Sequence, residues 1–452
     1  MTALAAQAAA LLQDGGGLAG IEQVIKAEML HSGAQMAHLL LDADRGYEGG
    51  HTDCGHGHQA RFVDYRPKTI LTTLGDVTLM RAYYHCAACG TGVFPRDEQL
   101  GVASTSLTRG AEKMLSLAGQ HEAFAPAAAL VRELAGIEVN AQRLGRVAKA
   151  RGAAAAGTVI EQATAIADGT LKLLPCGDIT ELPDKLYIAI DGTGTPVRPD
   201  QTSGRTGKNG GIAKTREVKL ARFFTSNQLD NNGSPLMDDN SSSYVHTFEA
   251  AEEFDPILEA EYLRRHGDHI RQVIVIGDGA KWIWNQADRL YPAATQIVDL
   301  YHAREHLTDL ADHLAFITGD RDSWLAERRD ELDAGDIDAI LTAARTYPLT
   351  GIKAAELDTK LGYFETNAHR MRYARFRSLG LFVGSGAVEA ACKSVIAQRV
   401  KHAGMRWNVH GANAIITLRC AHAAQPCDGR WDQLWPSTDS DHSGLTQGPR
   451  AI

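Results

Sequence analysis

Five short apolar segments in the second half of the chain have the pattern of buried strands. Each is a brief run of apolar and β-branched residues bounded by polar or turn-forming residues, which predicts a strand rather than a helix. The segments are residues 186–190, 218–224, 243–248, 272–276 and 295–298. We therefore expect an α/β domain, which we place at residues 185–435.

Helical periodicity follows the last of these strands. Apolar residues recur at three- and four-residue intervals over residues 303–375, and helical patterning resumes at Ala387. We expect a helical insertion in the α/β domain at about residues 303–380. After Pro436 the chain is rich in Ser, Gly and Asp, which predicts a disordered tail over residues 436–452.

The first half of the chain changes pattern twice. Residues 1–50 are rich in Ala and Leu and predict one or two helices, whereas residues 51–103 are rich in Cys, His, Thr and Tyr with strand-like alternation. Residues 104–184 return to a helical pattern. There Gly136 ends one predicted helix, and Asn140 can cap the next, which we expect to run through Arg151. This is the spacing of a helix-turn-helix motif that contacts DNA, although simple helix packing has the same signature.

The composition restricts the class of protein. A chain of 452 residues is too long for one ordinary core, so we expect several domains. It contains no uncharged apolar run long enough for a membrane span and no secretory signal at its start. Seven cysteines do not suggest a disulfide framework and fit a reducing cytoplasm.

The charge is unevenly distributed along the chain. A net charge of -9 argues against a basic coat over the whole surface. DNA binding depends on local patches, however, and residues 361–420 contain nine Lys or Arg but only Glu365 and Glu389 as acids. Such a run can also be a solvated helix face.

Three acidic residues have positions that suit phosphodiester chemistry. Asp191 and Asp278 each follow an apolar strand, where side chains leave the core, and Glu389 begins a helix after a glycine-rich turn. Two hard cations about 4 Å apart can stabilise the attacking and leaving oxygens, and carboxylates are the ligands that hold them. Each acid alone could be a simple turn former, but the three together favour a Mg²⁺ site.

Four segments around these acids carry a family resemblance. They are YIAIDGTGTPV at 187–197, VIGDGAKWIW at 275–284, VDLYHAREHL at 298–307 and GSGAVE at 384–389. Together with Cys54-Gly55 and the segment from Tyr83 to Cys89, they resemble the ISKra4-type bacterial insertion-sequence transposases. More loosely they resemble the Mutator-like and IS256 group. The resemblance covers about residues 50–420.

The resemblance implies a multidomain α+β protein with an RNase H-like catalytic core. Its DDE triad would be Asp191, Asp278 and Glu389, with two Mg²⁺ ions that Mn²⁺ could replace. The motif from Asp299 to His302 matches a C/D-x-x-H motif, so His302 would support the site, or would only pack beside it. Water would cleave the transposon-end DNA, and the freed 3′-OH would then attack target DNA. The implied partners are the terminal inverted repeats, target DNA and further copies of the chain, in the bacterial cytoplasm.

Two pairs of metal ligands predict a zinc-ribbon-like module at residues 51–103. The pairs are His51-x-x-Cys54 and Cys86-x-x-Cys89. A two-residue spacer lets both side chains of a pair converge on one tetrahedral ion. His56 and His58 are alternatives to His51 as the first ligand. A degenerate site that binds nothing is the alternative. Zinc would stabilise a module with little core of its own and could help it to bind DNA ends. The other four cysteines lack paired spacing and are expected to be ordinary thiols.

Basic and aromatic residues near the acids are candidates for DNA contact. The basic candidates are Lys208, Lys214, Arg399, Lys401 and Arg406. Lys208 lies in a glycine-rich segment that fails the spacing of a phosphate-binding Walker A loop. Trp282 and Trp407 could stack on a base, although we expect both in the core.

The alternatives to a transposase are a domesticated, non-catalytic DNA-binding protein and an RNase H-like nuclease or junction resolvase. A glycosidase would leave the zinc pairs and the basic region unexplained.

Overall fold

The computed structural model describes residues 17–170, 182–207, 210–384, 386–424 and 430–435, and only the backbone of residues 387–389 and 430. The chain divides into two compact units, residues 1–150 and 151–452. Both contain helices and strands, so the fold is mixed α+β. In the described ranges no helix is long and apolar enough to cross a membrane. The predicted tail at 436–452 and Lys208 lie outside these ranges.

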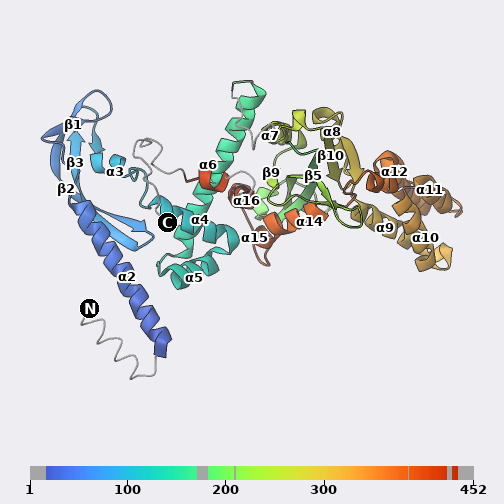
Figure 1. The fold of residues 1–452 in the computed structure, drawn as a ribbon, viewed down its shortest axis with the longest axis horizontal. Helices are drawn as coiled ribbons and strands as arrows, with labels where there is room; N and C mark the ends of the chain where they lie inside the picture. Colours follow the sequence, from blue (N-terminus) through green and yellow to red (C-terminus); the bar gives the residue numbers. More distant parts are fainter. Residues whose placement is uncertain (1–16, 171–181, 208–209, 385, 425–429, 436–452) are drawn as a thin grey trace, which may run out of the picture. The chain divides into compact units, whose positions relative to one another are not determined.

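The first unit contains a four-stranded antiparallel sheet in the order β1-β2-β3-β4. The strands are β1 (His51–Asp53), β2 (Gln59–Thr72), β3 (Gly75–Cys86) and β4 (Thr91–Val93). Alternate residues are buried in each half of β3, Val77 and Leu79 on one face in the first half and Tyr84 and Cys86 on the opposite face in the second half. The strand-like pattern at 51–103 is therefore confirmed. Helix α2 (Gly17–Asp42) packs along β3 (Figure 1).

Helices complete the first unit, and the last of them, α6, continues from Arg151 onward into the second unit. They are α3 (Pro95–Gln99), α4 (Arg109–His121), α5 (Phe124–Ala135) and α6 (Ala141–Ala167). As predicted, Gly136 ends α5 and the Asn140 side chain caps α6, accepting a 2.7 Å bond from the Arg143 amide. Helix α6 continues to Ala167, well beyond Arg151, where we expected its end, because Arg151 is followed closely by four alanines at 153–156, which favour helix.

The second unit is built on a five-stranded sheet in the order β11-β10-β5-β6-β9. The strands are β5 (Lys185–Pro196), β6 (Thr215–Thr225), β9 (Ser243–Thr247), β10 (Gln272–Gly277) and β11 (Thr295–Val298). All five predicted strands are confirmed. Strands β5, β6 and β9 pair antiparallel, whereas β10 and β11 run parallel to β5. Strand β5 does not end before Asp191, as we expected, but continues to Pro196 along β6 alone.

Two helices lead into the parallel strands β10 and β11, and a group of five helices comes next in the chain. Helices α7 (Ala251–Arg264) and α8 (Lys281–Leu290) lead into β10 and β11. The next five are α9 (Leu300–Thr318), α10 (Arg321–Ala334), α11 (Ile337–Arg345), α12 (Ile352–Asn367) and α13 (Tyr373–Ser378). Helices α10 to α12 gather at one end of the sheet (Figure 1), and their apolar faces share one core with the strands. The helical pattern predicted at 303–375 is confirmed.

The last described helices lie beside β5 and β9. They are α14 (Gly386–Ala391), the π-helical turn η5 (Cys392–Ala397), α15 (Gln398–Val400) and α16 (Val409–Ala423). Helix α14 contacts β5, and α16 contacts β9. The remaining short elements are η2 (Pro199–Gln201), β7 (Gln228–Leu229), β8 (Pro235–Leu236), η3 (Gly267–His269), η4 (Ala368–Arg370) and α18 (Arg430–Gln433).

Helix α6 approaches α16 so closely that only glycine fits at the contact. A Cβ at Gly152 would lie 2.0 Å from the carbonyl oxygen of Ala414, whereas a Cβ at Gly157 would meet nothing within 4 Å. We expect Gly152→Ala to lower the free energy of unfolding by about 1–3 kcal/mol, since the backbones must separate. Gly157→Ala on the same helix should instead add about 0.5–1 kcal/mol through helix propensity. Equal denaturation midpoints for the two variants would contradict this packing.

Candidate active site and candidate metal centre

Three parallel strands bring three aspartates to one level of the sheet. Ile276 of β10 pairs with Ala189 of β5, so two residues further on Asp278 lies opposite Asp191. The pairing of Gly277 with Val298 places Asp299 beside Asp278 in the same way. Neighbouring strands are about 4.8 Å apart. The two aspartates predicted to be catalytic are therefore neighbours, although 87 positions separate them in the sequence.

The carboxyl of Asp191 is electrostatically perturbed. Partial burial raises its pKa, and the nearby Asp278 carboxylate raises it further. A hydrogen bond from the thiol of Cys392 and the charge of His302 act in the opposite direction. Two carboxylates that repel each other in a partly desolvated site form an environment that a cation would relieve.

Asp278 is held by its own turn and by the inserted helices. Its Oδ1 accepts a 2.8 Å bond from the Ala280 amide, and its carbonyl accepts a 3.1 Å bond from the Tyr363 hydroxyl of α12. Gly279 has φ +99°, and a Cβ there would lie 2.6 Å from the Tyr363 ring. That ring also stacks on His306 of α9, with ring centroids 3.7 Å apart. Helices α9 and α12 thus position the loop that carries Asp278.

Asp299 and His302 have different surroundings. Asp299 is buried and caps α9, accepting bonds of 2.6 and 3.0 Å from the amides of Tyr301 and His302. This capping role explains why an Asp begins the motif from Asp299 to His302. The Nδ1 atom of His302 is buried and makes no hydrogen bond to the described part of the chain. Because buried polar atoms usually have a partner, this nitrogen is a candidate contact for a bound molecule near the two aspartates.

The third predicted acid, Glu389, lies on α14, beside β5. Its side chain is outside the described structure. Cys392, less than one helical turn later, donates its thiol hydrogen to Asp191. Burial and the nearby Asp191 carboxylate raise the pKa of this thiol, which keeps it protonated. Sequence reasoning treated Cys392 as an ordinary thiol. Its position three residues after Glu389 was the signal that could have placed it at the site.

The predicted DNA contacts divide into three groups. The Lys401 ammonium donates to the hydroxyl of Thr193, which lies two residues after Asp191 on β5. Lys214 and Arg406 are exposed. Arg399 is different, because it is completely buried, with its guanidinium 5.0 Å from the ring of Trp407. As placed it cannot contact a phosphate, so we correct its assignment from DNA contact to packing.

The two tryptophans differ in burial. Trp407 is buried, as expected, and its Nε1 donates to the carbonyl of Val400 at 3.1 Å. Trp282 is partly buried against the core, with the Lys219 ammonium 5.6 Å from its ring centroid. Neither ring therefore presents a free face of the kind that base stacking needs.

The raised pKa of Asp191 predicts a dependence of stability on pH. A carboxyl whose pKa is higher in the folded state loses stabilisation as the pH rises from its unfolded value, about 3.9, through its folded value. Without added divalent cation, we expect Asp191→Asn to raise the melting temperature at pH 7, where the wild-type group is ionised. The difference should shrink near pH 4. A lower melting temperature for the variant at pH 7 would contradict the repulsion between the two acids.

A second cluster lies in the first unit. One ligand atom from each of Cys54, His58, Cys86 and Cys89 lies within 4.8 Å of the others. Three thiols and an imidazole match the donors and number of a tetrahedral structural zinc site. Among the described side chains this is the one group of three or more Cys, His, Asp or Glu that converges in this way. Of the three acids predicted to bind Mg²⁺, only Asp191 and Asp278 have described side chains, so that site is not a group of this size.

The fourth ligand of this cluster is His58, not His51. His51 is exposed on β1, opposite Arg61 of β2. The turn after β1 reverses through two glycines with φ +79°, and the Cys54 amide donates to the His58 carbonyl at 3.1 Å. This closed loop carries the imidazole of His58 back to Cys54. The candidate ligand order is therefore Cys-x₃-His followed by Cys-x₂-Cys.

One thiol of the cluster, that of Cys89, already favours metal binding. Hydrogen bonds from the Thr91 hydroxyl, first, and from Cys86 lower the pKa of Cys89 to about 6. The thiolate is the form that binds a metal ion, so a lowered pKa reduces the cost of releasing the proton. The residues present therefore fit zinc.

Part of the chain is similar to a known protein family. No curated protein matches the chain. One family model matches slightly less than half of it, from the start of β6 to the end of α18. The matched segment contains Asp278, His302 and Glu389, whereas Asp191 and the Cys/His cluster precede it. Residues 212–433 are thus similar to an uncharacterised protein family, UPF0236.

Proposed function

We propose that the protein is a DDE transposase of the ISKra4 type with an RNase H-like catalytic core. Asp191, Asp278 and Glu389 would hold two Mg²⁺ ions, or Mn²⁺ in their place. The observation that carries the proposal is the register that sets Asp191 opposite Asp278, together with the raised pKa of Asp191. Carboxylate oxygens are the donors that such hard cations require, so the two described acids fit them.

The order of the strands supports the same proposal. Three antiparallel strands, β5, β6 and β9, are followed in the chain by two strands that join the other side of β5 in parallel. This is the arrangement expected of an RNase H-like sheet. It places the first acid on the central strand and the second on the adjacent parallel strand, while the third would come from a later helix. Helix α14, which carries Glu389, contacts β5 as that arrangement needs.

The side chains around the acids have separate parts in the proposed reaction. When bound, the cations would activate the attacking water and stabilise the leaving oxygen. The thiol of Cys392 orients the Asp191 carboxylate, and Tyr363 fixes the Asp278 loop. The ammonium of Lys401, beside Thr193 on β5, would contact the DNA backbone near the reacting phosphate. Lys214 and Arg406 would add salt-sensitive contacts further away.

The zinc cluster and the helices α5 and α6 would recognise the ends of the element. Zinc would fold the four-stranded sheet, and α6 would present its basic residues, such as the exposed Arg146, to DNA. Such an enzyme would act on DNA in the bacterial cytoplasm, and several copies would assemble on the two ends.

The experiment that tests this proposal uses the DNA that flanks the gene. We expect the zinc-loaded protein with Mg²⁺ to cut a linear fragment carrying those flanks at terminal inverted repeats, and to join the freed 3′-OH ends to a target plasmid. Cleavage of branched DNA with no preference for the ends would instead indicate a nuclease or resolvase. Specific binding without cleavage would indicate a non-catalytic DNA-binding protein.

A further inference from the structure

Helix α2 has one face that packs against its own unit. The Lys26 ammonium donates to the carbonyls of Glu133 and Leu134, at 3.0 and 2.8 Å, and Leu41 packs on the buried core around Leu79. Even so, α2 has no buried residue along its whole length. The helix is therefore held on one side only.

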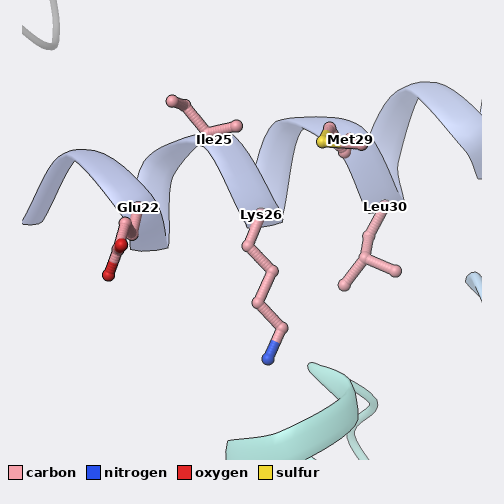
Figure 2. Close-up of a pocket in the computed structure, with 5 residues that line it drawn as sticks. All are labelled: Glu22, Ile25, Lys26, Met29 and Leu30. Carbon is pink, nitrogen blue, oxygen red and sulfur yellow. The ribbon is translucent and has the colours of Figure 1, made fainter. Parts of the chain in front are cut away.

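The other face of α2 carries a stripe of exposed apolar side chains, which we call the outer stripe. Its members are Leu18, Ile25, Met29, Met36, Leu39 and Leu40, with exposed fractions of 41–72%. Figure 2 shows Ile25 on the side of the helix opposite Lys26 and Leu30, which point toward the neighbouring helical region. Large aliphatic side chains seldom form a continuous exposed stripe unless they meet a partner.

The spacing of the stripe identifies the kind of partner. Successive members from Leu18 to Leu40 follow one another at intervals of seven, four, seven, three and one residues, so they fall on the a, d and e positions of a heptad. Only Glu22 and Ser32 are polar among the a and d positions. Helices with this repeat pair with a second helix, and an occasional polar residue in the seam fixes the register. The 26 residues of α2 span more than three heptads, the length that such pairing needs.

A hollow on α2 is lined by Glu22, Ile25, Lys26, Met29 and Leu30. Because Lys26 and Leu30 point toward the chain's own helical region (Figure 2), this hollow lies at the edge of the outer stripe, and the pairing does not depend on it.

Charge argues against a lipid surface or DNA as the occupant. Lys26 is the single Lys or Arg of α2, and its ammonium is bound to backbone carbonyls, while Glu22, Glu28 and Asp42 are acidic. A lipid surface or a DNA backbone would require a basic flank beside the apolar residues. The same stripe exists on every copy of the chain, so a two-fold contact is self-complementary. We propose that α2 is a dimerisation helix whose outer stripe pairs with α2 of a second copy.

The test is the mass of the full, zinc-loaded chain without DNA, by sedimentation velocity at micromolar concentration. We expect the wild type to be a dimer. Met29→Glu/Met36→Glu places charge in the seam and should raise the dissociation constant at least 100-fold, so that the variant sediments as a monomer. Both side chains are exposed, so the monomer should keep its fold, which circular dichroism would check.

The matched control adds the same charges elsewhere on α2. Gln23→Glu/Ala27→Glu changes two exposed positions outside the stripe and should remain a dimer. A monomeric wild type at tens of micromolar would overturn the proposal. So would a stripe variant that stays dimeric, or a control that dissociates to the same extent. None of these outcomes depends on whether the protein cleaves DNA.

Discussion

Replacing Asp278 with Asn is expected to abolish DNA cleavage and strand transfer without unfolding the protein. The amide keeps the shape of the side chain and an oxygen for the Ala280 amide, which now donates to Asp278 at 2.8 Å. It loses the charge that holds a cation. Losing several kcal/mol of transition-state stabilisation corresponds to a decrease of at least about 1,000-fold in the cleavage rate.

The measurement is the single-turnover cleavage rate on DNA carrying the element ends, with melting temperature as a check on folding. Asp338→Asn is the matched control, because Asp338 is an exposed acid in the first turn of α11, outside the proposed site. Its rate should match that of the wild type. A cleavage rate of Asp278→Asn within tenfold of the wild-type rate would contradict the proposal that the protein is a DDE transposase.

Loss of zinc is expected to unfold the four-stranded sheet of the first unit. The core under its metal end is small, consisting mainly of Cys54, Ala60, Ala82, Tyr84 and Cys86. In small zinc domains the bound ion supplies about 10–16 kcal/mol of apparent folding free energy. Without it, residues 51–93 should become sensitive to proteolysis, while the second unit keeps its own melting transition.

The identity of the fourth ligand gives this prediction a matched pair of variants. His58→Ala should lower the zinc content of the purified protein well below one ion per chain and expose the sheet to protease. His51→Ala, on the exposed face of β1, should retain zinc and resistance. Equal loss of zinc in both variants would contradict the ligand set described above.

The strands were predictable because burial on both faces demands continuous apolar runs. Residues 272–276 and 295–298 form such runs, and the structure confirms both as strands. The extension of β5 beyond Asp191 was not visible, since residues 192–196 carry glycines and threonines rather than apolar side chains. Their strand form comes from pairing with β6, a tertiary contact that a local pattern does not contain.

The zinc ligands show a similar limit. The cysteine pair at 86 and 89 was clear from its spacing, but three histidines within eight positions were all plausible ligands. Only the fold of the loop, with its two left-handed glycines, places His58 rather than His51 next to Cys54. Spacing alone identified Cys54, Cys86 and Cys89, but it favoured His51 where the structure brings His58 to the cluster.

The basic C-terminal segment was the least predictable part. Of its nine Lys or Arg residues, Arg370, Arg399 and Arg419 are buried. Long basic side chains can cover apolar surface, so their number did not show how many face solvent. Lys401 and Arg406 remain candidates for DNA contact, whereas Arg399 belongs to the packing around Trp407.

The central claim is that Asp278 binds the catalytic cation directly, and a change of ligand tests it most closely. Mg²⁺ strongly prefers oxygen ligands, whereas Mn²⁺ accepts sulfur more readily. Asp278→Cys should therefore be inactive on transposon-end DNA with Mg²⁺ and regain cleavage with Mn²⁺, while Asp278→Ala stays inactive with both. Equal activity of Asp278→Cys with the two metals, or no recovery beyond that of Asp278→Ala, would contradict a direct contact between Asp278 and the metal.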